Sequence, residues 1–146
     1  MPKTITIDSS VFVSSFLETD PNYKISRDFI NKITKENIPI LIPLTTFMEV
    51  LHACHRAFND LTKTDQLYKK MIEWNLTRQI RFLNIEAQEL VYFTAHHHRF
   101  KLKTADAIVA LTAHRLKCPL ITWDKQLLNV SSEIETLTPE KFLQTK

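Results

Sequence analysis

The sequence contains no glycine in 146 residues. A chain of this length ordinarily carries about ten, at a usage of ~7%. Glycine-rich phosphate loops and dinucleotide-binding fingerprints are therefore excluded. Left-handed backbone positions must be filled by asparagine, aspartate or a strained residue. The helix that we expect over 104–116 must stop before Pro119, so we expect Lys117 to adopt a positive φ angle.

The length suits a single domain over residues 1–146, and a chain with 44% hydrophobic and 24% charged residues is an ordinary globular protein. No apolar run reaches the roughly 18 residues of a membrane span, and no signal peptide is recognisable, which predicts a cytoplasmic protein. The net charge of +3 is compatible with a polyanionic partner but does not establish one. Cys54 and Cys118 are expected to be buried free thiols.

Short apolar segments alternate with amphipathic segments along the chain. The expected strands cover 4–7, 40–42, 80–83, 119–122 and 134–137. We expect a first helix that Ser9 or Ser10 caps, a second helix over about 22–36 with Asn37 as its C-cap, and a short last helix that Thr138 caps. Further helices are expected in a stretch from residue 44 and over 67–76, 86–96 and 104–116. Several strands are apolar on both faces, which is typical of a parallel sheet covered by helices. We expect a three-layer α/β/α domain with a central parallel sheet of about five strands.

Four acidic residues stand where this fold places them near one edge of the sheet. Asp8 follows the first expected strand and Asp124 follows the fourth. Because the carboxyl ends of parallel strands meet at one edge, where α/β sites form, these two side chains should emerge together. Glu49 lies in the helix after the second strand, and Asp106 in the first turn of the helix before the fourth, both among apolar neighbours.

Each acid taken alone has an ordinary explanation. Asp8 can cap a helix, Asp106 can complement a helix dipole, and the other two can be surface acids. Four converging carboxylates would nevertheless repel one another unless a cation lay among them. Mg²⁺ and Mn²⁺ prefer carboxylate oxygens and water, and such a site can activate water for attack on a phosphodiester.

The surroundings of the four acids resemble the motifs of the PIN-domain ribonuclease family, particularly its VapC-like toxins. The matching segments are Ile7-Asp8-Ser9-Ser10-Val11-Phe12, Phe47-Met48-Glu49-Val50-Leu51, Thr104-Ala105-Asp106-Ala107-Ile108 and Leu120-Ile121-Thr122-Trp123-Asp124. The resemblance covers nearly the whole chain. It implies an endoribonuclease in which the four acids bind Mg²⁺ or Mn²⁺ and catalyse cleavage, while Ser10 and Thr122 hydrogen-bond the metal-site carboxylates. The chain departs from the pattern at Gln126, where some relatives carry a charged residue.

The same resemblance implies the toxin of a toxin–antitoxin pair, restrained by an antitoxin protein. It also implies a homodimer, whose interface we expect on helices away from the acids. Two alternatives stay open: a PIN-type nuclease in RNA maturation or turnover without an antitoxin, and a catalytically inactive binding scaffold. The intact acidic set argues against the scaffold. The sequence leaves the RNA target, the cleavage position and the number of metal ions open.

Basic and aromatic residues near the motifs carry weaker predictions. The basic residues nearest the acids are Arg99, Lys101, Lys103 and Lys125. They suit a substrate with a phosphate backbone, although a solvated loop would contain them equally well. Residues 96–98 are three consecutive histidines, which we expect at a solvated helix end rather than around one ion. Trp74 is expected in the core, whereas Trp123 could pack there or stack on a base.

Overall fold

The computed structural model describes residues 3–130 and 132–145. Within them the elements are β1 (Thr6–Ile7), α1 (Ser9–Phe16), α2 (Tyr23–Lys35), β2 (Ile40–Pro43), α3 (Leu44–Phe58), α4 (Leu61–Leu76), β3 (Ile80–Leu83), α5 (Ala87–His96), the 3₁₀ helix η1 (His97–Arg99), α6 (Thr104–Leu116), β4 (Leu120–Ile121), α7 (Lys125–Leu128), β5 (Thr136–Leu137) and α8 (Pro139–Gln144). No helix among the described residues is long and apolar enough to cross a membrane.

All strand pairings are parallel. β1, β4 and β5 form one ladder, and β2 pairs with β3. A bridge between Ile5 and Ile40 joins the two ladders, with Ile5 N donating to Pro39 O at 3.1 Å and Leu41 N donating to Ile5 O at 2.9 Å. The strand order is therefore β3-β2-β1-β4-β5, which confirms the expected parallel sheet.

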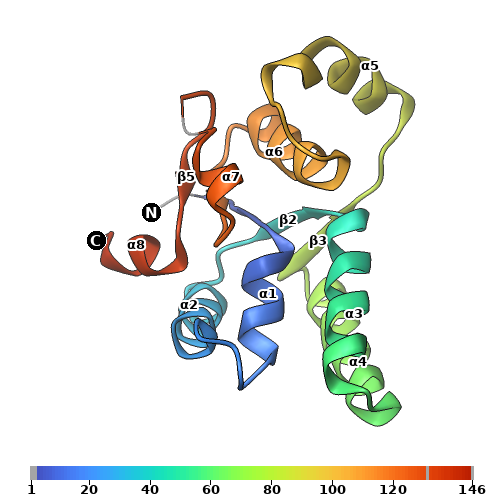
Figure 1. Ribbon diagram of the computed structural model, residues 1–146, viewed down its shortest axis with the longest axis vertical. Coiled ribbons are helices and arrows are strands. Elements are labelled where there is room, and N and C mark those ends of the chain that lie inside the picture. The colour runs from blue at the N-terminus through green and yellow to red at the C-terminus, as the bar shows by residue number, and fades with distance from the viewer. Residues whose placement is uncertain (1–2, 131, 146) are drawn as a thin grey trace.

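Helices cover both faces of this sheet. In Figure 1, α6 lies above the strands, whereas α1, α3 and α4 lie below them. Two separate apolar clusters fill the spaces between the layers. Leu120 belongs to the cluster with α6 and its neighbour Ile121 to the other, because successive strand residues point to opposite faces. The three-layer α/β/α arrangement is thus as expected.

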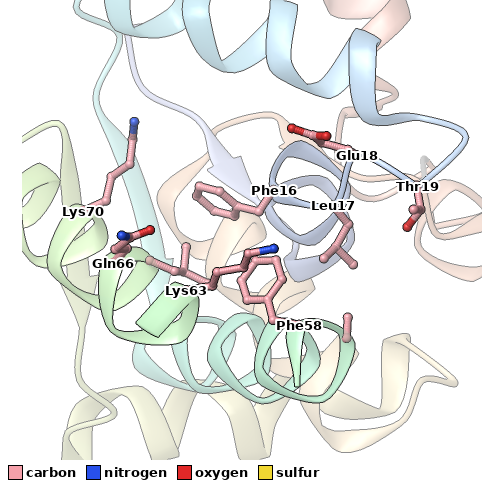
Figure 2. Close-up of a pocket in the computed structure, with 10 residues that line it drawn as sticks. Phe16, Leu17, Glu18, Thr19, Phe58, Lys63, Gln66 and Lys70 are labelled. Carbon is pink, nitrogen blue, oxygen red and sulfur yellow. The ribbon is translucent and has the colours of Figure 1, made fainter. Parts of the chain in front are cut away.

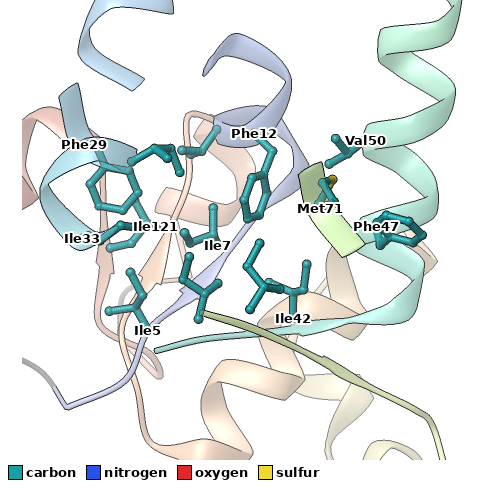
Figure 3. Packing of buried hydrophobic residues seen from close by; sticks show 14 of the residues in the cluster. Ile5, Ile7, Phe12, Phe29, Ile33, Ile42, Phe47, Val50, Met71 and Ile121 are labelled. Atoms are coloured by element: carbon teal, nitrogen blue, oxygen red, sulfur yellow. The ribbon is translucent and has the colours of Figure 1, made fainter. Parts of the chain in front are cut away.

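The larger cluster holds the acidic edge of the sheet in place. Phe12 of α1, Ile7 of β1 and Ile42 of β2 are completely buried and lie near one another, as Figure 3 shows. Met71 of α4 is also fully buried in this cluster. Since α1 begins directly after β1, this packing fixes the turn that carries Asp8.

Some element boundaries differ from the sequence prediction. The cap of α1 is Asp8 itself, whose side chain accepts a hydrogen bond from Ser10 N, rather than Ser9 or Ser10. α4 begins at Leu61, well before residue 67, because Asp60 caps it by accepting hydrogen bonds from two backbone N–H groups. The short helix α7 was not expected at all.

The missing glycines have the predicted effect on the backbone. Lys117 adopts a φ of 51° at the end of α6, which confirms the expectation. Asn37 and Asn59 also have positive φ angles, of 53° and 46°, and Arg78 has one of 62°. Asparagine tolerates this region, whereas lysine and arginine pay a steric cost there.

Replacing Lys117 with glycine should therefore stabilise the fold slightly. The gain is at most roughly 1 kcal/mol, because the freedom that glycine adds to the unfolded chain offsets part of it. Urea unfolding measures the difference. Glu73→Gly, at an exposed helical position of α4, is the control and should cost roughly 0.5–1 kcal/mol. If both variants lost the same stability, the strain at Lys117 would be absent.

Candidate active site

Asp8 lies where β1 turns into α1, and only 4% of it is exposed. Its Oδ2 accepts hydrogen bonds from Ser10 Oγ at 2.6 Å, Thr122 Oγ1 at 3.0 Å and Ser10 N at 3.3 Å. Among the described residues, these are the hydrogen bonds of this carboxylate, and no buried side-chain oxygen or nitrogen lacks a partner. Oδ1 is therefore the oxygen that faces solvent and could bind a ligand.

Thr122 connects the ends of β1 and β4. Its side chain is completely buried. The hydroxyl donates to Asp8 Oδ2 and accepts a hydrogen bond from Asp124 N at 2.9 Å. The Asp124 carboxylate in turn caps α7 by accepting from Gln126 N at 2.6 Å. The Thr122 hydroxyl thus orients both the Asp8 side chain and the backbone at Asp124.

Glu49 of α3 and Asp106 of α6 complete the acidic group, and both are partly exposed. Burial is the main cause that raises the pKa of Glu49, and the charges of Asp8 and Asp106 raise it further, against a hydrogen bond from the Ser9 side chain that lowers it. Burial also raises the pKa of Asp106, with the charges of Asp8 and Asp124 adding to it. The four acids are therefore close enough to repel one another.

The prediction that Asp8, Glu49, Asp106 and Asp124 hold a metal ion concerns the site with its cation, because the four carboxylates repel one another without one. Among the residues that the structure describes, no three histidine, cysteine, aspartate or glutamate side chains form a group that could hold one ion. Repulsion between like charges is a sufficient physical reason for the side chains to stand apart. The donors still fit a hard divalent cation, because all four are carboxylates and neighbouring carboxylates add to the burial that raises the pKa values of Glu49 and Asp106.

The four basic residues near the motifs differ in whether they interact with the acids. Lys103, the N-cap residue of α6, acts on Asp106 and lowers its pKa against the effects of burial and the neighbouring acids. Arg99 instead forms an ion pair with Glu133 at 3.3 Å, a contact that the sequence did not predict. Lys101 and Lys125 are exposed. Only Lys103 is tied to the acids by an interaction in the described residues.

The aromatic residues are engaged in packing. Trp123 packs against the larger core cluster and donates its indole N–H to Ser26 Oγ at 2.8 Å, so its ring is held by the core. Trp74 stacks on Phe16 with ring centres 6.2 Å apart, in line with the expected core role. Among the three histidines, His97 and His98 are exposed in η1, but His96 stacks on a neighbouring tyrosine of α5.

A cavity of about 550 Å³ lies far from these acids along α1. Figure 2 shows it between the C-terminal end of α1 and the helices α3 and α4, with Lys63 lying beside Phe58 and near Phe16. Asp8 stands at the opposite end of α1. This cavity is therefore separate from the acidic group.

The raised pKa values predict how the metal-free protein responds to pH. A folded-state pKa above the unfolded value means that the folded protein binds the proton more tightly. The stabilisation from Glu49 and Asp106 is thus present at low pH and is lost as pH rises through the range above their ordinary values of 4.5 and 3.8. Thermal melts in EDTA across this range should show less loss of stability in Glu49→Gln/Asp106→Asn than in the wild type. Equal pH slopes in the two proteins would contradict the raised pKa values of Glu49 and Asp106.

Comparison with known proteins agrees with this geometry. Residues 5–133 match the model of the PIN domain family. No curated protein matches the sequence, but solved structures share the fold. The protein PAE2754 of Pyrobaculum aerophilum superposes with a TM-score of 0.64 at 17% identity, over 96% of this chain and 92% of that one.

Two further similar structures come from toxin–antitoxin systems. VapC20 of Mycobacterium tuberculosis, a toxin that cleaves the sarcin-ricin loop, has a TM-score of 0.64 at 11% identity, over 86% of this chain and 94% of that one. A toxin–antitoxin complex from Klebsiella pneumoniae contains a chain with a TM-score of 0.64 at 20% identity, over 93% of this chain and 98% of that one. At these identities the likeness concerns the fold.

Proposed function

This chain belongs to the PIN domain family, a family of nucleases, and on that basis we propose that it is an endoribonuclease that hydrolyses RNA phosphodiesters with Mg²⁺ or Mn²⁺. The position of Asp8 is the observation that carries the proposal. The strand order reverses at β1, so Asp8 and Asp124 follow the two strands that flank the reversal. Ligands of open α/β sheets bind at this point.

In this proposal, the carboxylates of the acidic group hold the cation and so form the catalytic site. The group consists of Asp8, Glu49, Asp106 and Asp124. When bound, the cation supplies a Lewis acid that polarises the phosphodiester and promotes attack by water. Ser10 and Thr122 hold Oδ2 of Asp8, which leaves Oδ1 for the ligand. Glu49 and Asp106, whose pKa values are raised by burial and by neighbouring carboxylates, would be ionised when they hold a cation.

The RNA backbone would approach from the side of Lys103. Its ammonium group already acts on Asp106, so it can offset the charge of a phosphate beside the acids. Exposed Lys101 and Lys125 extend this positive rim. Arg99 contributes only if its ion pair with Glu133 opens, and such exposed pairs are worth about 0–1 kcal/mol.

We further propose that the protein is a toxin restrained by an antitoxin protein. The support is its similarity in fold to VapC20 and to the Klebsiella pneumoniae complex. An antitoxin encoded beside this chain, whose co-expression suppresses growth arrest and RNA cleavage, would establish the pair. Cleavage without such a neighbour or arrest would favour RNA maturation or turnover.

Cleavage assays with purified protein test the nuclease proposal. We expect the wild type to cut single-stranded RNA in Mg²⁺ or Mn²⁺ and to lose that activity in EDTA. DNA of the same sequence is the control for the nucleic-acid class. Failure to cut any member of a broad RNA panel, or cutting that survives EDTA, would overturn the proposal.

We expect the protein to form a symmetric homodimer through helices remote from the acids. α4 supports this, because three apolar side chains on it are exposed: Leu61 by 77%, Tyr68 by 47% and Leu76 by 76%. Their spacing places them on one side of the helix. Light scattering should give the mass of a dimer, and Leu61→Glu/Leu76→Glu should give that of a monomer. A monomeric wild type at high micromolar concentration would contradict the prediction.

A further inference from the structure

A chain of buried hydrogen bonds joins the core to the residue that precedes Asp124. The Trp123 indole N–H donates to the Ser26 hydroxyl of α2 at 2.8 Å. Ser26 Oγ lies 2.6 Å from Ser14 Oγ of α1, and Ser14 donates to Val11 O at 3.0 Å. Both serines are buried, with exposures of 0% and 2%. Helices α1 and α2, which lie side by side in Figure 1, are thus both connected to the segment that follows β4.

The direction of each hydrogen bond in this chain follows from the groups that form it. A carbonyl oxygen can only accept, so the single proton of the Ser14 hydroxyl is used on Val11 O. Ser26 must therefore donate to Ser14. The Ser26 oxygen is then free to accept from the Trp123 indole, which can only donate. No hydroxyl can rotate without breaking a buried hydrogen bond, so the chain has one arrangement.

Trp123 donates a second hydrogen bond from its backbone. This N–H donates to Ser10 Oγ at 3.1 Å, and the Ser10 hydroxyl donates to Asp8 Oδ2 at 2.6 Å. Because Ser10 accepts from Trp123, its own proton is directed toward the Asp8 carboxylate. The residue after Trp123 is Asp124. Trp123 therefore connects the buried serines to both of the acids that follow β1 and β4.

We propose that Ser26 is a positioning residue for the metal site and acts through the Trp123 indole on Asp8 and Asp124. The inference rests on the proposed nuclease function. Carboxylates that bind a cation are oriented by the groups that hydrogen-bond to them, and these groups must be held in place in turn. With its indole bound to α2, Trp123 cannot move away from Ser10 without breaking a buried hydrogen bond. Ser26 thereby fixes the geometry of two ligands that it does not touch.

The alternative role of Ser26 is to stabilise the core alone. A hydrogen bond between buried neutral groups adds little net stability, because it replaces hydrogen bonds with water. An apolar side chain between α1 and α2 would need no partner at all. The hydroxyl of Ser26 differs from such a side chain in that it gives the indole of Trp123 an acceptor at a fixed place. This difference favours a role in positioning.

Nuclear magnetic resonance in EDTA tests the connection without metal or RNA. Ser26→Ala removes the acceptor of the indole. Ser15→Ala is the matched control, because Ser15 is only 3% exposed and its hydroxyl donates to Phe12 O within α1, at 2.7 Å. We expect the backbone amide signals of Ser10 and Asp124 to shift in Ser26→Ala and to stay in place in Ser15→Ala. If neither signal moves in Ser26→Ala, the inference is wrong.

A titration with Mg²⁺, followed by the amide signal of Asp124, measures the effect on the metal site. Ser26→Ala should bind Mg²⁺ about two- to tenfold more weakly than the wild type, which corresponds to the loss of one hydrogen bond. Ser15→Ala should bind it as the wild type does. Equal Mg²⁺ affinity in Ser26→Ala and the wild type, even with a lower melting temperature, would show a role in stability alone and overturn the inference. A wild type that does not respond to Mg²⁺ would overturn the proposed function instead.

Trp123→Phe tests the same hydrogen bond from its other end. Phenylalanine keeps an aromatic ring against the core but lacks the indole N–H. The double variant Ser26→Ala/Trp123→Phe should bind Mg²⁺ no more weakly than the weaker single variant, because both changes remove one interaction. Losses that add in the double variant would show that the two residues act separately, against the proposal. If Ser26→Ala does not fold, Trp123→Phe decides alone, and wild-type Mg²⁺ affinity in it would overturn the inference.

Discussion

Asp8→Asn should reduce RNA cleavage at least about 100-fold while the protein stays folded, because even residues that only support a metal ligand are worth about 10–100-fold. Asparagine keeps the size of the side chain and remains a good helix cap, so α1 should form as before. The substitution removes the negative charge of the most buried acid of the group. Affinity for Mg²⁺ or Mn²⁺ should fall with it, since a neutral amide is a weaker ligand for a hard cation.

Asp60→Asn is the matched control for this substitution. Asp60 also caps a helix, accepting hydrogen bonds at 2.8 and 3.1 Å from backbone N–H groups of α4, but it lies outside the acidic group. Melting temperature in EDTA should stay level or rise in Asp8→Asn, because the repulsion felt by Glu49 and Asp106 decreases. Added Mg²⁺ should raise the melting temperature of the wild type and of Asp60→Asn only. Undiminished cleavage by Asp8→Asn would remove Asp8 from the mechanism.

The sequence predicted the fold and the edge of the sheet that carries the acids. These features depend on chain order and periodicity, which the sequence shows directly. β1 is only two residues long, yet the apolar run that ends at Asp8 marks it clearly. The positive φ of Lys117 was also predictable, because a proline limits the helix and no glycine is available.

Long-range side-chain contacts were not predictable in the same way. The Trp123 indole donates a hydrogen bond to Ser26, and Arg99 forms an ion pair with Glu133. Packing between elements that are distant in sequence brings these residues together. The sequence predicted four carboxylates near one another, but their closest approach requires a cation to offset their charge, and no three such side chains form an ion-binding group among the described residues.

Among the residues that do not belong to the acidic group itself, Thr122 should be the most sensitive to substitution. Its hydroxyl donates to Asp8 Oδ2 and accepts from Asp124 N, at 3.0 and 2.9 Å. Thr122→Val removes both hydrogen bonds while nearly preserving the shape of a fully buried side chain. Asp8 would then keep only its bonds from Ser10, and the partly buried N–H of Asp124 would lose its acceptor.

We expect Thr122→Val to lower cleavage by about 10–100-fold, because Asp8 is no longer oriented by the hydroxyl. The free energy of unfolding should fall by about 1–3 kcal/mol, because the N–H of Asp124 loses its acceptor. Thr112→Val is the matched control: Thr112 is also buried, but its hydroxyl donates only to Ile108 O within α6, at 2.7 Å. Cleavage rates at saturating Mg²⁺ separate the two possible effects in Thr122→Val. If excess Mg²⁺ restores the rate, the hydroxyl acts on metal affinity; if it does not, the hydroxyl orients Asp8 during the reaction. Equal cleavage by the two valine variants would show that the link between β1 and β4 supports only the fold.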